Sequence, residues 1–138
     1  MPDTLTKDEL LALAANVLDI EARAVDALKA RLDDSFVAAC ELCMATPGRV
    51  VVTGMGKSGH VSNKIAATLA STGTPAFFMH PAEASHGDLG MLTGHDLLLA
   101  ISYSGETAEV VTILPIVKRM GAKLLSITGN PHSTMAQA

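Results

Sequence analysis

The chain has 138 residues, of which 49% are hydrophobic and 17% are charged, and its formal net charge is −4 at pH 7. This composition is typical of one globular domain with a real core, and the acidic balance with few aromatic residues argues against nucleic-acid binding. No uncharged apolar run reaches the roughly 18 residues of a membrane-spanning helix, and residues 1–9 lack the pattern of a secretory signal. We therefore expect a cytoplasmic protein without a membrane partner.

Apolar residues at helical spacing predict two helices at the start of the chain, over residues 7–32 and 36–45. Thr6 and Glu9 can form a capping box for the first, and residues 33–35 can cap the second. We expect residues 1–46 to be the N-terminal helical segment of a single domain that spans 1–138. A first helix of this length suits packing against a partner subunit or against its own sheet.

Four short apolar runs predict buried parallel strands at 49–53, 76–79, 96–102 and 123–128. Between and after them, helices are expected at 57–71 and 106–120, and from about Thr134. Residues 80–94 should be irregular with one helical turn, and Pro115 should perturb its helix. This order predicts an α/β fold, a three-layer α-β-α arrangement with a parallel, doubly wound, flavodoxin-like sheet of at least four strands, preceded by two helices.

Glycine and hydroxyl residues follow two of the predicted strands. The first turn is Gly54-Met55-Gly56-Lys57-Ser58-Gly59, and the second is Ser102-Tyr103-Ser104-Gly105-Glu106-Thr107. Each leads into a helix N-terminus, where free N–H groups and partial positive charge favour an anion such as phosphate. Either turn alone fits a tight turn or a helix cap. Together they predict that a phosphorylated small molecule is held between neighbouring strands.

Two nucleotide-binding motifs compete for the first turn. The pattern G-x-G-x-x-G is typical of dinucleotide sites, which need an acidic residue after the second strand, where this chain has His80-Pro81. Gly56-Lys57-Ser58 matches the end of a P-loop, but Val51 occupies the position of its leading glycine. A nucleotide-binding fragment is therefore a third and weaker interpretation.

Cys40 and Cys43 form a C-x-x-C pair, which a redox dithiol or half of a zinc site would also use. No second C-x-x-C is present in the sequence, so a structural role with one cysteine facing the core is favoured. His80, His86 and Asp88 could form a catalytic metal site, but no further ligand has suitable spacing. The remaining histidines, which are interpreted as surface or capping residues, are His60, His95 and His132.

From about Val50 to Ala138 the chain resembles the sugar isomerase (SIS) domain family, and within it the arabinose 5-phosphate isomerases. The matching segments are GMGKSGH at 54–60, ASTGTP at 70–75, HPAEASHGDLGM at 80–91 and SYSGE at 102–106. The third is the most specific, because SIS domains in general do not carry it. The resemblance implies interconversion of D-ribulose 5-phosphate and D-arabinose 5-phosphate through an enediol, supplying 3-deoxy-D-manno-octulosonate for lipopolysaccharide. It also implies a homo-oligomer with no required cofactor. The alternative to an isomerase is a non-catalytic, regulatory sugar-phosphate-binding module.

The same resemblance implies roles for individual residues. Lys57 and Glu109 fall at catalytic positions, Glu109 as acid or base and Lys57 to stabilise the enediolate or contact the phosphate. Substrate or phosphate contacts fall at Gly56, Ser58, Gly73, Thr74, His80, His86, Ser102, Ser104 and Thr107. His80 is also where the family can hold an inhibitory zinc ion. Without the family, Lys57 and Glu109 also fit a solvated helix face.

The family pattern continues with features that this sequence does not contain. Its members have a fifth strand, a further catalytic glutamate and a histidine in a Ser-His-Pro-Gly-Gly segment, and most then carry a pair of cystathionine-β-synthase-type (CBS) regulatory domains. Because the sequence stops at Ala138, just inside a helix pattern, we expect a domain truncated at its C-terminus and lacking the CBS pair. Such a chain is expected to bind sugar phosphate but to turn it over slowly or not at all.

Overall fold

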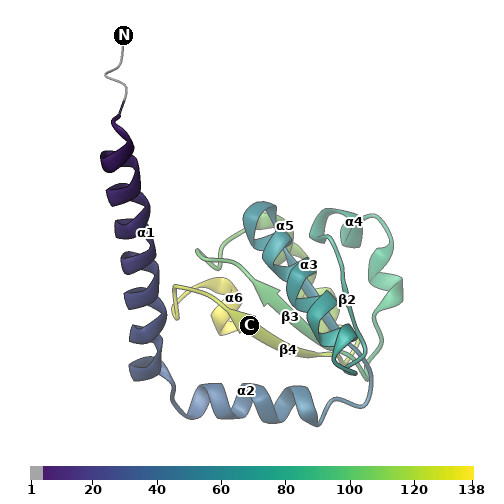
Figure 1. Ribbon diagram of the computed structural model, residues 1–138. Coiled ribbons are helices and arrows are strands. Elements are labelled where there is room, and N and C mark those ends of the chain that lie inside the picture. The colour runs from purple at the N-terminus through teal and green to yellow at the C-terminus, as the bar shows by residue number, and fades with distance from the viewer. Residues whose placement is uncertain (1–4) are drawn as a thin grey trace. The chain divides into compact units, whose positions relative to one another are not determined.

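The computed structural model, drawn in Figure 1, describes residues 5–138. Its first compact unit ends at Ala38, and its second runs from Ala39 to Ala138. The second unit contains the whole β-sheet and every candidate site residue predicted above. None of the helices in residues 5–138 has the length and apolar character needed to cross a membrane.

The first unit contains α1 (Lys7–Ala27), the 3₁₀ helix η1 (Leu28–Arg31) and the start of α2 (Asp34–Met44). The predicted capping box begins α1: the Thr6 N–H donates to Glu9 Oε2 at 2.7 Å, and Thr6 Oγ1 accepts from the Glu9 N–H at 3.3 Å. The first predicted helix is therefore confirmed, although its last turn tightens to 3₁₀ geometry. Asp33 Oδ1 accepts from the Ser35 N–H at 3.0 Å and so caps α2.

Four parallel strands form the sheet of the second unit, namely β1 (Val50–Gly54), β2 (Ala76–Phe78), β3 (Leu97–Ile101) and β4 (Lys123–Ile127). Their order is β2-β1-β3-β4. The two central strands, β1 and β3, are buried along their whole length, as their unbroken apolar runs predict. This strand order is the start of a flavodoxin-like sheet, so the predicted topology is confirmed.

Helical elements pack on both faces of this sheet; they are α3 (Gly56–Ser71), α4 (Pro81–Ser85), η2 (Asp88–Met91), α5 (Ala108–Arg119) and α6 (Thr134–Gln137). On one face Val51 packs in a core cluster with Ile113 of α5. On the other face Val52 packs in a second cluster with Ala66 of α3 and Leu42 of α2. Neighbouring residues of β1 thus serve opposite faces, which produces the three-layer arrangement, with α3 across one face of the sheet in Figure 1.

Two stretches differ in detail from the prediction. Residues 80–94 contain two short helical elements, α4 and η2, where one helical turn was expected. Helix α5 begins at Ala108 rather than residue 106, and it continues through Pro115. Proline at that position removes one N–H donor from the helix but does not end it.

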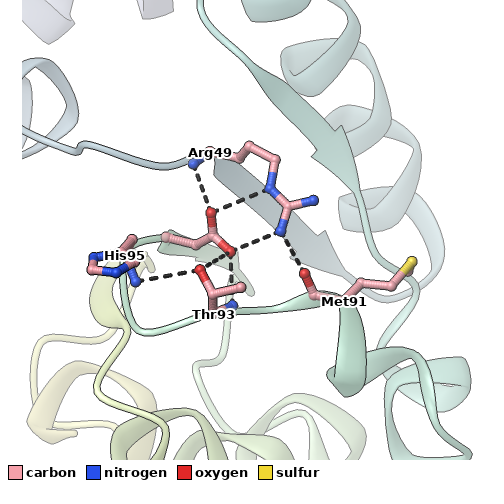
Figure 2. A network of polar contacts seen from close by, with 5 residues as sticks. Arg49, Met91, Thr93 and His95 are labelled. Carbon is pink, nitrogen blue, oxygen red and sulfur yellow. Dashed lines mark hydrogen bonds and ion pairs between the residues drawn. The ribbon is translucent and has the colours of Figure 1, made fainter.

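An ion pair with a buried carboxylate stabilises the amino-terminal edge of the sheet (Figure 2). Asp96, whose side chain is 1% exposed, accepts from Arg49 Nη2 at 2.9 Å and from the Arg49 backbone N–H at 2.7 Å. The Thr93 N–H and hydroxyl donate to the same carboxylate at 2.8 and 2.9 Å. Arg49 also donates to the Met91 carbonyl at 2.5 Å. Since Arg49 precedes β1 and Asp96 precedes β3, the network ties the end of segment 80–96 to the sheet.

Candidate functional site

The two glycine-rich turns begin side by side at the carboxyl-terminal edge of the sheet. Gly54 and Ile101, the last residues of β1 and β3, are register partners in adjacent strands. After them the chain enters α3 at Gly56 and α5 at Ala108. The arrangement predicted from the sequence, with both turns at the same edge of neighbouring strands, is therefore present.

The helices that follow these turns lack side-chain caps. Met55 is the N-cap of α3 and Thr107 that of α5, and neither side chain accepts a helix N–H. By contrast, the side chains of Thr6, His80 and Ser133 cap α1, α4 and α6. The first-turn N–H groups of α3 and α5 are thus donors for an anion, and the helix dipole adds partial positive charge there.

Hydroxyl groups cluster in the second turn. The Ser102 hydroxyl lies 2.8 Å from Thr107 Oγ1 and 3.4 Å from Ser104 Oγ, and it accepts from the Gly105 N–H at 3.1 Å. Ser104 Oγ accepts from the Glu106 N–H at 3.2 Å. These bonds stabilise the turn ahead of α5 and do not cap the helix, so the capping alternative does not account for the two serines.

Lys57 and Glu109 occupy equivalent places after the two turns. Lys57 is the second residue of α3 and is exposed, whereas Glu109 is the second residue of α5 and is half-buried. Both therefore lie in the first turn of a helix that starts at the carboxyl-terminal edge. The structure thus brings an ammonium group and a carboxylate to the edge that carries the uncapped N-termini.

A cavity of about 300 Å³ opens beside α3, close to the end of β2; its lining residues are Gly56, Gly59, His60, Asn63, Phe78 and His80. His80 Nδ1 accepts from the Ala82 N–H at 3.3 Å, which leaves Nε2 to carry the ring proton. The His80 and Phe78 rings meet edge to face, with centroids 6.2 Å apart. The cavity therefore combines an apolar ring with several polar side chains.

The sequence motifs predict only part of this cavity. They predict Gly56 and His80 as substrate contacts and do not point to Asn63, whereas the interpretation of His60 as a surface residue agrees with its exposure. Positions 56, 59, 60 and 63 follow the i, i+3, i+4, i+7 spacing of one helix face. That spacing, applied to polar and glycine residues rather than to apolar ones, is the signal that places His60 and Asn63 beside Gly56 and Gly59.

Some predicted substrate contacts lie elsewhere. Gly73 and Thr74 precede β2, so they lie at the amino-terminal edge of the sheet, where Thr74 lines an apolar groove with Cys43 and Leu69. His86 ends α4 and is exposed. Ser58 is half-buried in the first turn of α3. The structure does not bring Gly73 and Thr74 to the carboxyl-terminal edge, and their role stays a prediction.

The cysteines fit the structural interpretation. Cys40 is exposed and Cys43 is half-buried, packed against the second core cluster, and both are free thiols. Burial raises the pKa of Cys43, which disfavours the thiolate that metal binding and disulfide exchange require. Within residues 5–138, no group of three or more His, Cys, Asp or Glu side chains is placed to hold a metal ion. A zinc ion at His80 stays a prediction.

Comparison with known proteins agrees with the geometry, since the SIS domain model matches residues 43–138. The chain belongs to the SIS domain family. The "arabinose 5-phosphate isomerase KdsD" of Pseudomonas aeruginosa is 64% identical over 125 residues, which cover 91% of this SIS chain and 38% of that protein. The KdsD of Escherichia coli K12 is 52% identical over 122 residues, covering 88% and 37%.

A solved structure extends the likeness to three dimensions. The E. coli CFT073 protein c3406 in complex with arabinose 5-phosphate matches this SIS chain with a TM-score of 0.91 and 41% sequence identity. The match covers 96% of this chain and 71% of that one. The SIS chain therefore shares its fold with a protein that holds arabinose 5-phosphate, while it spans less than two fifths of the length of the KdsD relatives.

Proposed function

We propose that this SIS chain binds a pentose 5-phosphate at the carboxyl-terminal edge of its sheet and interconverts D-arabinose 5-phosphate and D-ribulose 5-phosphate. The observation that carries the proposal is the pair of uncapped helix N-termini, side by side after β1 and β3. The identity with KdsD relatives and the likeness to a protein in complex with arabinose 5-phosphate support a sugar phosphate as the ligand. The product would supply 3-deoxy-D-manno-octulosonate synthesis.

The phosphate group is assigned to the second turn. A phosphate monoester presents several acceptor oxygens, so it needs donors and positive charge. The hydroxyls of Ser102, Ser104 and Thr107 and the first N–H groups of α5 supply donors, and the N-terminus of α3 with Lys57 adds positive charge. In our proposal the second turn therefore holds the phosphate.

The isomerisation needs one base and one group that stabilises an oxyanion. Glu109 takes the proton from C2 of the aldose, the C1–C2 double bond forms, and the carbonyl oxygen on C1 becomes an enediolate oxygen. The proton is then returned to C1, the O2 proton moves to O1, and the ketone forms at C2, so no co-substrate is consumed. The Lys57 ammonium stabilises the negative oxygen during this exchange.

The residue after β2 counts against the nucleotide-binding alternative. His80 occupies the place at which a dinucleotide site needs an acidic residue for the ribose hydroxyl.

Proton exchange with solvent tests the proposal. The chain is incubated with D-arabinose 5-phosphate in D₂O, and ¹H NMR follows the C2 proton of the aldose. We expect the C2 signal to disappear slowly, yet faster than in buffer, and the signals of ribulose 5-phosphate to grow. A thermal-shift titration with the same ligand measures binding in parallel.

The second candidate is a non-catalytic sugar-phosphate-binding module, favoured by the location of Gly73 and Thr74 at the opposite edge from Lys57. Ligand-dependent thermal stabilisation without any C2 exchange would support that module and remove the isomerase proposal. Absence of both stabilisation and exchange would overturn both.

A further inference from the structure

Two polar side chains, His60 and Asn63, line the cavity beside α3. Phosphate binding at the two glycine-rich turns gives them no function. Both residues are exposed, and within residues 5–138 neither side chain forms a hydrogen bond with the protein. They lie three residues apart on α3 and so share one helix face. Their donors and acceptors are therefore free for a ligand in the cavity.

One glycine leaves room for that ligand, and a second lets α3 pack closely on β1. Gly56 has a φ of 56°, and a side chain added there would meet nothing within 4 Å, so this position opens toward free space. Gly59 packs so closely on β1 that an added Cβ would lie 2.6 Å from the Gly54 carbonyl oxygen. The cavity wall on α3 therefore consists of backbone at these two positions, with the His60 and Asn63 side chains next to it.

The other lining residues come from the end of β2. His80 uses Nδ1 to accept from the Ala82 N–H, which leaves Nε2 as a donor. Phe78 contributes an apolar ring, held edge to face against His80. A carbon chain with hydroxyl groups has matching chemistry, because its C–H groups can pack on the ring while its hydroxyls exchange hydrogen bonds with neutral side chains.

These side chains suit hydroxyl groups better than a phosphate. A hydroxyl both donates and accepts, as do the amide of Asn63 and a neutral imidazole, whereas a phosphate needs mainly donors and positive charge. The cavity lies on the β2 side of β1. The second glycine-rich turn (residues 102–107, the serine turn) follows β3 on the other side of β1. Because β1 lies between β2 and β3 and adjacent strands are about 4.8 Å apart, a five-carbon chain that crosses the end of β1 can reach from the α3 wall of the cavity to the turn after β3.

We propose that His60 and Asn63, beside the predicted substrate contact His80, bind the hydroxyl groups of the open-chain sugar and thereby determine which sugar phosphate the chain accepts. This inference rests on the proposed function and deepens it, since it separates recognition of the sugar from recognition of the phosphate. His60 and Asn63 are specificity residues in this account, and they take no part in proton transfer.

The test compares three ligands by isothermal titration calorimetry: D-arabinose 5-phosphate, its C2 epimer D-ribose 5-phosphate, and methyl phosphate. The variants are His60→Ala and Asn63→Ala, with His95→Ala as the matched control, because His95 is an exposed histidine at the opposite edge. Each cavity variant should weaken binding of arabinose 5-phosphate about tenfold, the loss expected for a hydrogen-bonding side chain. Each should also reduce the preference between the epimers and leave methyl phosphate unaffected.

Circular dichroism of each variant checks folding, which exposed positions should not disturb. In the wild-type chain, the ¹H NMR signal of His60 Cε1–H should shift with arabinose 5-phosphate but not with methyl phosphate. Unchanged affinity of both cavity variants for arabinose 5-phosphate overturns this inference and leaves the proposed function standing. Equal loss of methyl phosphate binding also overturns it, because the residues would then act on the phosphate. A wild-type chain that binds none of the ligands overturns both proposals.

Discussion

Arg49 and Asp96 are separated by 47 residues in the sequence, yet their side chains form a forked ion pair at the amino-terminal edge of the sheet. The Asp96 side chain is almost fully buried, whereas the Arg49 side chain is 39% exposed. The carboxylate receives five hydrogen bonds, from the backbone and side chains of Arg49 and Thr93. The starts of β1 and β3 and the end of segment 80–96 are thereby joined at one group (Figure 2).

Removing the charge of Asp96 should therefore destabilise the fold. Asp96→Asn keeps the shape of the side chain but replaces a carboxylate oxygen with an NH₂ group, which leaves Arg49 and Thr93 donors without their acceptor. We expect a loss of roughly 1.5–3 kcal/mol in the free energy of unfolding, measured by urea denaturation. Asp88→Asn, an exposed aspartate in the same segment, should change it by less than about 0.5 kcal/mol. Equal stability of the two variants would contradict this role.

The same pair predicts a pH dependence. Burial alone would raise the pKa of Asp96, but the hydrogen bonds from Arg49 and Thr93 outweigh it and hold the pKa well below its usual range. A carboxylate with a lowered folded-state pKa contributes stability above its unfolded pKa of about 3.9 and loses it as the pH falls toward the folded value. The stability difference between wild type and Asp96→Asn should thus be full at pH 6 and shrink below about pH 4. A difference independent of pH between 6 and 3 would argue against it.

Gly59 is expected to tolerate no side chain. An added Cβ would lie 2.6 Å from the Gly54 carbonyl oxygen, and because that atom is backbone, α3 must move away from β1. Overpacking of this kind costs about 1–3 kcal/mol, so Gly59→Ala should lower the urea midpoint clearly. Gly90→Ala is the control, since an added Cβ there meets nothing within 4 Å and its φ is not positive. Gly59→Ala as stable as Gly90→Ala would show that α3 shifts freely.

The serine turn should control phosphate affinity. In Ser104→Ala the turn loses the hydroxyl that accepts from the Glu106 N–H and lies near Ser102. We expect binding of methyl phosphate and of arabinose 5-phosphate to weaken by the same factor, about five- to tenfold, because both ligands lose one donor. Calorimetric titration of both ligands measures this. A loss restricted to the sugar phosphate would move the phosphate away from this turn.

Glu109 should act in proton transfer rather than in binding. Glu109→Gln preserves size and hydrogen bonding but removes the base, so we expect C2 proton exchange in D₂O to fall by at least about 100-fold, while the affinity for arabinose 5-phosphate changes little. Glu83→Gln, an exposed glutamate in α4, is the matched control. Exchange that survives in Glu109→Gln would assign the base to another residue.

The sheet and both glycine-rich turns could be predicted because their signals are local. Unbroken apolar runs mark β1 and β3 as buried parallel strands, and parallel strands that are neighbours bring their carboxyl ends to one edge. The adjacency of Gly54 and Ile101 follows from that order alone. Short helices are harder to predict, since α4 and η2 contain five and four residues and show too few turns for a periodic pattern.

The missed features depend on contacts between distant segments. Nothing near Arg49 in the sequence indicates that its partner is Asp96, because the pair forms only once β1 and β3 lie side by side. Asn63 lies outside the GMGKSGH motif, and only the helical face that it shares with Gly56 brings it to the cavity. Gly73 and Thr74 belong to a segment that matches the family, and the direction of β2 puts them at the amino-terminal edge, so their role as substrate contacts stays a prediction.

The Arg49–Asp96 network and the two glycine-rich turns lie at opposite edges of the sheet, which bears on how the protein can be redesigned. The carboxyl-terminal edge presents exposed or half-buried side chains, among them Lys57, His60, Asn63, Ser104 and Glu109, whereas the carboxylate that fastens the sheet lies at the far edge. A combinatorial library at positions 60 and 63 can therefore vary the accepted sugar without lowering the stability of the fold. Most of its members should express as folded protein. The SIS chain is in this sense a starting point for selecting binders of other sugar phosphates.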